Sequence, residues 1–317
     1  MKRRNMSYAY LISLLVVLVG WVAPVRSAGT ELQKRFETLF VRATTGEIKY
    51  QNLVKPAKDS IAAMGAEAVP FLIDKCDTKS ARERVAIIEM LKQIGRPAVP
   101  GLVKGLRRTN GLVVERVCMA LAEIADSSSV PGLLTVTGHS RWQVREQAVG
   151  ALGKCKDHRA DSAVAAALVD TIGQVRKSAA VASGQLNLNP LVPQLVHLLA
   201  DDFYGARMCA LETLLGLDTA NVIGAIADSM VSSNASIGDR ACAVLGRFNT
   251  PRSREVLLMQ TKSDRPARRA HAGVALISGD PLDSSGLQQL FVTPEKNPLV
   301  RLKLESAIVA GKSSTGK

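Results

Sequence analysis

The segment Val130–Asp157 reads VPGLLTVTGHSRWQVREQAVGALGKCKD, and it carries every feature of a unit that recurs along the chain. Proline at its second position suits the first turn of a helix, where the missing N–H costs no hydrogen bond. Apolar residues then fall at helical spacing, first from Leu133 to Val136 and again from Val144 to Leu152. The segment therefore predicts two short helices joined by a tight turn.

A turn-forming residue ends this unit and returns every 30 or 31 residues. Gly, Asn and Asp tolerate a left-handed helix end or cap the next helix. The series is Gly65, Gly95, Asp126, Asp157, Asn187, Asp218, Asn249, Asp280 and Gly311. A fixed period of this length indicates a solenoid of stacked helix pairs. The predicted fold is all-α, an α-α superhelix of about eight repeats of 31 residues.

Two further features share the period. The string Val-Pro opens units at Val69, Val99, Val130 and Val192. About fourteen residues later a basic residue precedes small ones, and this arginine register is Arg84, Arg145, Arg176, Arg207, Arg269 and Arg301. In the second and sixth units the arginines, Arg116 and Arg240, are shifted from the register. We expect those two units to pack irregularly or to bend the superhelix.

The pattern V-P-x-L followed by V-R-x-x-A-x-x-x-L-G resembles HEAT-like repeats, in the short form named after phycobiliprotein lyases. The resemblance covers most of the chain after its first 28 residues, and it implies a HEAT/armadillo-like solenoid. One enzyme built on such repeats, deoxyhypusine hydroxylase, holds its iron on His-Glu pairs. None of His139, His158, His197 and His271 is followed by glutamate, so those pairs are missing here.

The N-terminus predicts export. Three basic residues precede an apolar run from Leu11 to Ala23, and small residues follow up to Ala28, as in a secretory signal peptide. The alternative is an uncleaved N-terminal anchor, although the run is shorter than the ~20 residues of a spanning helix. The predicted organisation is a signal peptide or anchor over 1–28, capping helices over 29–65, repeats over 66–311 and a polar tail over 312–317.

The charge favours acidic partners. The net charge is +13, and removing residues 1–28 takes away four basic residues and no acidic one, which leaves +9. A basic surface attracts acidic proteins, anionic polymers or membrane surfaces. Export removes most nucleic acid from reach, so we expect a protein partner and no nucleic acid. Membrane association through an uncleaved N-terminus stays open.

Residues for chemistry are sparse. The histidines lie far apart, and the five cysteines form no C-x-x-C pair, so we predict no metal site, no cofactor and no catalytic residue. The cysteines are interpreted as small buried apolar residues, with one disulfide between adjacent units as the alternative.

The arginine register is the strongest candidate for a binding site. Aligned guanidinium groups could bind an acidic segment, or each could pair with an acidic residue in the next unit, and we favour the second reading. Exposed aromatics beside the register are frequent binding anchors, but packing against the neighbouring turn is the favoured interpretation. The candidate partner-binding residues are Trp142, Arg145, Arg176, Phe203, Tyr204 and Arg207.

These features favour a non-enzymatic scaffold, located in the periplasm or cell envelope, that binds another protein. Two alternatives remain. The family name suggests an accessory lyase, and the basic charge suggests nucleic-acid binding, as in alkylpurine DNA glycosylases built from HEAT-like repeats.

Overall fold

The computed structural model describes residues 29–230, 235–279 and 295–315. Within those ranges the chain is built from helices and short connections, with no strand, so the all-α prediction is confirmed. The described residues form two compact units, which divide between Asp126 and Ser127. The repeat period had predicted one continuous array and gave no sign of this division.

The first unit opens with a helix that the structure describes from residue 29 to residue 44. The helices that follow are α2 (Gln51–Ala62), α3 (Val69–Asp74), α4 (Ala81–Ile94), α5 (Val99–Gly105) and α6 (Gly111–Ile124). Short 3-10 turns separate them at η1 (Ile48–Tyr50), η2 (Gly65–Ala68), η3 (Lys75–Asp77) and η4 (Arg96–Ala98). Residues 29–65, predicted as capping helices, thus hold the first helix and α2.

The second unit repeats a short first helix and a longer second helix. The first helices are α7 (Val130–Leu134), α9 (Asp161–Ala167), α11 (Val192–Leu198), α13 (Thr219–Ser229) and α15 (Pro251–Gln260). The second helices are α8 (Trp142–Cys155), α10 (Gly173–Gln185), α12 (Tyr204–Gly216), α14 (Ala235–Phe248), α16 (Pro266–Gly279) and α18 (Pro298–Thr315). The 3-10 turns η5 (Ser127–Ser129), η6 (His158–Ala160) and η7 (Asn189–Leu191) precede α7, α9 and α11.

The Val-Pro strings start helices as predicted, because α3, α5, α7 and α11 each carry the proline in their first turn. The turn residues act in both expected ways. Gly65, Gly95, Asn187 and Asn249 adopt positive φ, while Asp157 and Asp218 accept a backbone N–H at the start of the next helix. Two units differ in detail, since the left-handed residues there are Ala125 and Lys156. The aspartate follows each of them.

The last turn residue was predicted wrongly. Gly311 lies inside α18, which continues to Thr315, so most of the predicted polar tail is helical. Asp280 lies outside the described residues, as does the predicted signal peptide over 1–28.

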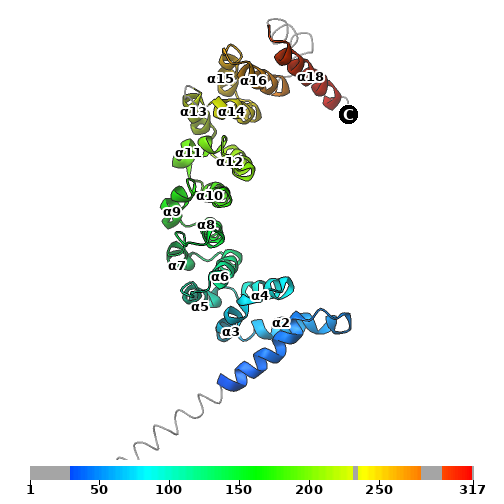
Figure 1. Cartoon of the computed structure of the whole chain (residues 1–317), viewed down its shortest axis with the longest axis vertical. Coiled ribbons are helices and arrows are strands. Elements are labelled where there is room, and N and C mark those ends of the chain that lie inside the picture. Colours follow the sequence, from blue (N-terminus) through cyan, green and yellow to red (C-terminus); the bar gives the residue numbers. More distant parts are fainter. Residues whose placement is uncertain (1–28, 231–234, 280–294, 316–317) are drawn as a thin grey trace, which may run out of the picture. The chain divides into compact units, whose positions relative to one another are not determined.

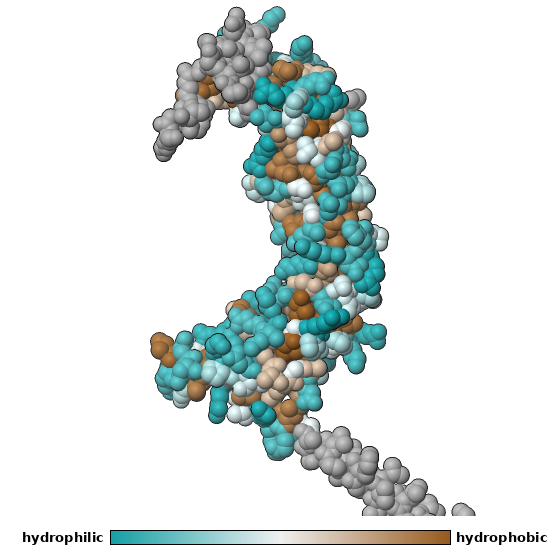
Figure 2. Space-filling model, turned by 180° about the vertical axis from the view of Figure 1, so that it is seen from behind, coloured by the Kyte–Doolittle hydropathy of each residue, from teal (hydrophilic) through white to brown (hydrophobic). Residues whose placement is uncertain are grey.

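Within the second unit the helices form two layers (Figure 1). The first helices α7, α9, α11, α13 and α15 follow one another in one layer, and the second helices α8 to α16 follow one another in the other. Neighbouring second helices pack directly, as α10 does against both α8 and α12. On the face shown in Figure 2, exposed hydrophobic residues lie among hydrophilic ones.

Close helix packing depends on small residues. Gly153 of α8 is buried against α10, and a Cβ built on it would lie 2.7 Å from the Cα of Ala182. On the same helix, a Cβ built on Gly150 would meet nothing within 4 Å. The two glycines therefore have different roles, although both stand in the same helix.

The five cysteines are all free. Four are buried, and burial raises the pKa of Cys76, Cys118 and Cys242 to about 12. This agrees with their interpretation as small apolar residues, and the alternative disulfide does not form.

The two glycines of α8 give a matched test of the close packing. Gly150→Ala should stabilise the protein by about 1 kcal/mol, because alanine favours the helix and the space is open. Gly153→Ala should lower stability by about 1–3 kcal/mol, because the methyl group displaces the α10 backbone. Thermal melting of the two variants measures both effects. Equal stabilisation by both would show that α8 and α10 do not approach this closely.

Candidate functional site

The register arginines of the second unit occupy one position, the fourth residue of each second helix that carries one. There the side chain can turn back over the preceding connection. The Nη1 group donates to a carbonyl oxygen six residues earlier in Arg145, Arg176, Arg207 and Arg269, at 2.9, 2.7, 2.7 and 2.9 Å. This bond fixes how each guanidinium is oriented.

Three of these arginines also bind a carboxylate of the next repeat. Arg145 Nε and Nη2 each lie 2.8 Å from an oxygen of Asp170. Arg176 binds Asp201 in the same way at 2.6 and 2.7 Å. The bidentate pair of Arg269 is with Glu295, at 2.8 and 3.0 Å. We call this series the arginine–carboxylate ladder and each pair a rung.

Each carboxylate of the ladder has a second bond. Its oxygen accepts the backbone N–H two residues further on, from Ile172 to Asp170 at 2.9 Å, from Phe203 to Asp201 at 2.8 Å, and from Asn297 to Glu295 at 2.8 Å. The acid therefore shapes the connection that leads into its own second helix. A rung thus joins the second helix of one repeat to the connection that precedes the second helix of the next repeat.

The pKa values of the rung carboxyl groups are lowered, as expected for acids paired with arginine. The hydrogen bond from Arg145 lowers the pKa of Asp170, and burial opposes it only in part. Arg269 lowers the pKa of Glu295 in the same way. For Asp201, burial raises the pKa, but the bonds from Arg176 and from the Phe203 N–H outweigh it. The carboxylates are held in their charged form.

Arg207 departs from the ladder. It donates from Nη1 to the carbonyls of Asp201 and Asp202, at 2.7 and 3.1 Å, yet no described carboxylate lies within hydrogen-bond distance of it. Its guanidinium carbon lies 5.3 Å from the ring centre of Tyr204, which is 64% exposed. Tyr204 is the most exposed of the six candidate residues.

The remaining candidate residues are less accessible. Phe203 is half-buried and covers Gly173, since a Cβ built on that glycine would lie 2.3 Å from the phenylalanine Cβ. It fills the gap between α10 and α12, as the packing interpretation proposed. Trp142 is half-buried as the first residue of α8. The prediction that these residues bind a partner remains untested.

The two shifted arginines reach backwards to the preceding repeat. Arg116 is buried and donates to the carbonyls of Cys76 and Thr78, and Arg240 donates to that of Leu199 at 2.9 Å. All three bonds end near the C-terminus of a first helix, where carbonyls lack helical partners. The shift thus replaces a forward rung with a backward bond.

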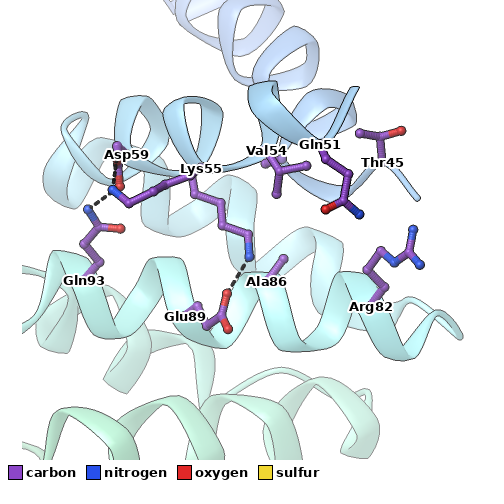
Figure 3. A pocket seen from close by; sticks show the side chains of 11 residues that line it. Thr45, Gln51, Val54, Lys55, Asp59, Arg82, Ala86, Glu89 and Gln93 are labelled. Atoms are coloured by element: carbon purple, nitrogen blue, oxygen red, sulfur yellow. Dashed lines mark hydrogen bonds and ion pairs between the residues drawn. The ribbon is translucent and has the colours of Figure 1, made fainter. Parts of the chain in front are cut away.

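The first unit holds a polar groove of about 510 Å³ that runs between α2 and α4 (Figure 3). Lys58 Nζ lies 2.5 Å from a Glu89 oxygen, and Asp59 accepts from Lys55 at 2.8 Å and from Gln93 at 3.0 Å. The bonds from Lys55 and Gln93 lower the pKa of Asp59. The contacts Lys58–Glu89 and Asp59–Gln93 cross the groove and therefore join α2 to α4.

Sequence reasoning missed both the carboxylates of the ladder and these lysine–glutamate pairs. The signal was present in the spacing. An acid stands 25 or 26 residues after each paired arginine, and Lys58 and Lys92 stand 31 residues before Glu89 and Glu123. Opposite charges at the repeat period predict contacts between neighbouring repeats.

Within the described residues, no three His, Cys, Asp or Glu side chains gather where they could hold a metal ion. His158 faces Asp161 at 3.1 Å, and the His271 ring lies 2.7 Å from the Ala267 carbonyl oxygen. In the same part of the chain, no helix has both the length and the apolar character needed to cross a bilayer.

Comparisons with known proteins support the fold. Residues 99–184, from α5 to α10, match the family model for HEAT repeats, so this stretch consists of HEAT-like repeats. No protein with a curated description matches the chain.

Several solved structures are similar at low identity. The YibA protein of Escherichia coli is 14% identical, with 84% of this chain and 98% of that chain covered and a TM-score of 0.48. Human deoxyhypusine hydroxylase in complex with glycerol is 17% identical, with coverage of 81% and 99% and a TM-score of 0.35. The complex of CpcE and CpcF of phycocyanin lyase from a Nostoc species is 14% identical, with coverage of 76% and 94% and a TM-score of 0.39. At these values the similarity carries no argument about activity.

Removing a rung tests whether the ladder is structural. Arg145→Ala should destabilise the protein by about 1–3 kcal/mol, because it leaves the half-buried Asp170 without its charge-assisted bonds. Arg145→Lys should recover only part of this, since lysine cannot pair bidentately. The exposed pair Arg252–Glu255 supplies the control, and Arg252→Ala should change the melting temperature little. An Arg145→Ala protein as stable as the wild type would contradict the structural role.

The lowered pKa values also predict an acid dependence. A carboxyl whose pKa is lower in the folded state stabilises the protein above its unfolded pKa, about 4, and loses this as the pH falls through the folded value. Asp170→Asn removes one such group. The melting temperature of the Asp170→Asn protein should therefore fall less between about pH 6 and about pH 3 than that of the wild type. Parallel curves for the two proteins would exclude a contribution from this rung.

Proposed function

We propose that this chain is an exported, non-enzymatic scaffold that binds another protein on the second-helix layer of its second unit, around Tyr204 and Arg207. The fold supports a scaffold, because a HEAT-like solenoid presents rows of helices along an extended surface. Two rows are present in this unit, and α12 lies in the second-helix row (Figure 1).

The observation that carries the proposal is the exposed pair on α12. Tyr204 has 64% of its surface exposed and lies against the guanidinium of Arg207. Tyrosine and arginine are enriched among the residues that dominate binding energy at protein interfaces. Met208, one turn further along α12, is 37% exposed and extends the apolar surface beside them.

The neighbouring rungs supply rigidity to this surface. Arg145 and Arg176 form ion pairs with Asp170 and Asp201, so their guanidinium groups already have partners within the chain. They hold α8, α10 and α12 in register and leave recognition to the exposed side chains of α12. This narrows the six candidate residues to Tyr204 and Arg207 as direct contacts.

The positive charge suits an acidic partner outside the cytoplasm. The chain without residues 1–28 has a net charge of +9, which attracts acidic proteins over a distance set by the ionic strength. Export rests on the basic start and short apolar run of the N-terminus.

Photo-crosslinking tests the binding face. Benzoylphenylalanine in place of Tyr204 should crosslink a partner in cells that express the chain with its own N-terminal segment. The control position is Met259 of α15, which is 53% exposed but belongs to the first-helix layer. Crosslinks only at position 204 support the proposed face. Crosslinks at neither position, or at Met259 alone, contradict it.

Export is tested separately by intact-mass analysis of the protein recovered from the cell envelope. The expected mass is that of a chain lacking a segment that ends near Ala28. A full-length mass in the envelope would indicate an uncleaved anchor. A full-length chain found only in the cytoplasm would reject export.

A further inference from the structure

We infer that Arg207 is an open rung of the arginine–carboxylate ladder, and that a carboxylate side chain of the protein partner completes it. This inference rests on the proposed function and adds the chemistry of the group that is recognised. At the same position of other repeats the chain itself supplies the carboxylate.

The filled rungs define what the position binds. In each, one edge of the guanidinium, made of Nε and Nη2, faces both oxygens of a carboxylate at 2.6 to 3.0 Å. The other nitrogen, Nη1, is occupied by the carbonyl six residues earlier. The repeat thus builds a planar site with two donors, and that geometry matches a carboxylate.

Arg207 has the same anchor and lacks the acid. It stands fourth in α12, and its Nη1 donates to the carbonyl of Asp201 at 2.7 Å, as its counterparts do. The residue 25 positions ahead is Ser232, where Arg145 and Arg176 find Asp170 and Asp201 at the same spacing. No described carboxylate lies within hydrogen-bond distance, and residues 231–234 read Val-Ser-Ser-Asn. The Nε–Nη2 edge is held in place without a carboxylate.

Two other register arginines show that this state is specific to Arg207 within the described chain. Arg301 uses Nε and Nη2 on the carbonyl of Glu295, at 3.2 and 2.5 Å, so its edge is already engaged. Arg84 makes no side-chain hydrogen bond to a described residue, so it lacks the carbonyl bond that orients Arg207. A fixed donor pair loses less entropy on binding than a mobile one.

The surroundings favour a peptide over a free anion. Tyr204 and Met208 are exposed one turn apart on α12, with Arg207 between them in sequence. Apolar side chains next to an acidic residue can bury themselves against this pair while the carboxylate meets the guanidinium. The nearby Asp202 carboxylate is bound by Arg176 at 2.6 Å. We therefore assign the site to an Asp or Glu flanked by apolar residues.

Two short peptides test this on the full chain. The probe is a fluorescein-labelled Gly-Leu-Glu-Leu-Gly amide, and its control carries Gln in place of Glu. Fluorescence anisotropy at low salt should show the Glu peptide binding at least about tenfold more tightly, because only Glu completes a charge-assisted bidentate pair. This preference should weaken as NaCl is added, since the site is partly exposed.

Matched variants separate this role from a structural one. Arg207→Gln should abolish the preference for Glu and lower the melting temperature less than Arg176→Gln does, because it removes bonds to carbonyls but leaves no carboxylate without its partner. Arg176→Gln, in a filled rung, should lower the melting temperature and keep the preference at a temperature where the protein is folded. Equal binding of the two peptides by the wild type would overturn the inference. So would an Arg207→Gln protein that melts like Arg176→Gln and still prefers Glu.

Two further readouts distinguish the sources of failure. Inorganic phosphate that displaces the Glu peptide at a concentration at which acetate does not would overturn the carboxylate assignment in favour of a phosphate-type anion. A partner that crosslinks at position 204 equally well in the Arg207→Gln background would leave the proposed function standing and remove the open rung. Loss of that crosslink in this background supports both.

Discussion

One guanidinium joins three parts of this protein at once. In a filled rung, arginine bonds to a carbonyl of the connection before its own helix, and its other edge binds a carboxylate that shapes the next connection. The turn between helices, the start of the second helix and the register of the next repeat therefore depend on the same side chain. Breaking a half-buried pair leaves a charge without its partner, so such bonds matter more than exposed ion pairs.

Both the arginine–carboxylate ladder and the apolar core hold neighbouring repeats together. Small residues such as Gly153 and Ala182 let second helices approach closely. The rungs add direction, because a bidentate pair forms only in one geometry. In the first unit the pairs Lys58–Glu89 and Lys92–Glu123 join equivalent positions of successive repeats. Those side chains are more exposed, and such pairs contribute less.

Much of the fold could be predicted because its determinants are local. Val-Pro starts a helix wherever it occurs, and the turn residues end helices by their own backbone preferences. The carboxylate partners of the arginines were harder to predict from the sequence. Asp170 and Asp201 are recognised only when their spacing from Arg145 and Arg176 is measured. Gly311 was wrongly predicted as a turn residue, since glycine also occurs inside helices such as α18. The division after Asp126 depends on packing between repeats, and no local residue pattern reports it.

The direction of the rungs has a consequence for how such a chain changes in length. Every filled rung takes its arginine from one repeat and its acid from the following one, and the spacing between successive acids, Asp170 and Asp201, equals that between Arg145 and Arg176. Excising one whole repeat between Arg145 and Asp201 brings that aspartate to the place that Asp170 held, and the pair reforms. Duplicating a repeat inserts a complete rung. Between Arg145 and Asp201 the chain can therefore lose or gain a whole repeat during evolution without breaking the pairing, whereas an insertion that is not a whole repeat breaks the register at once.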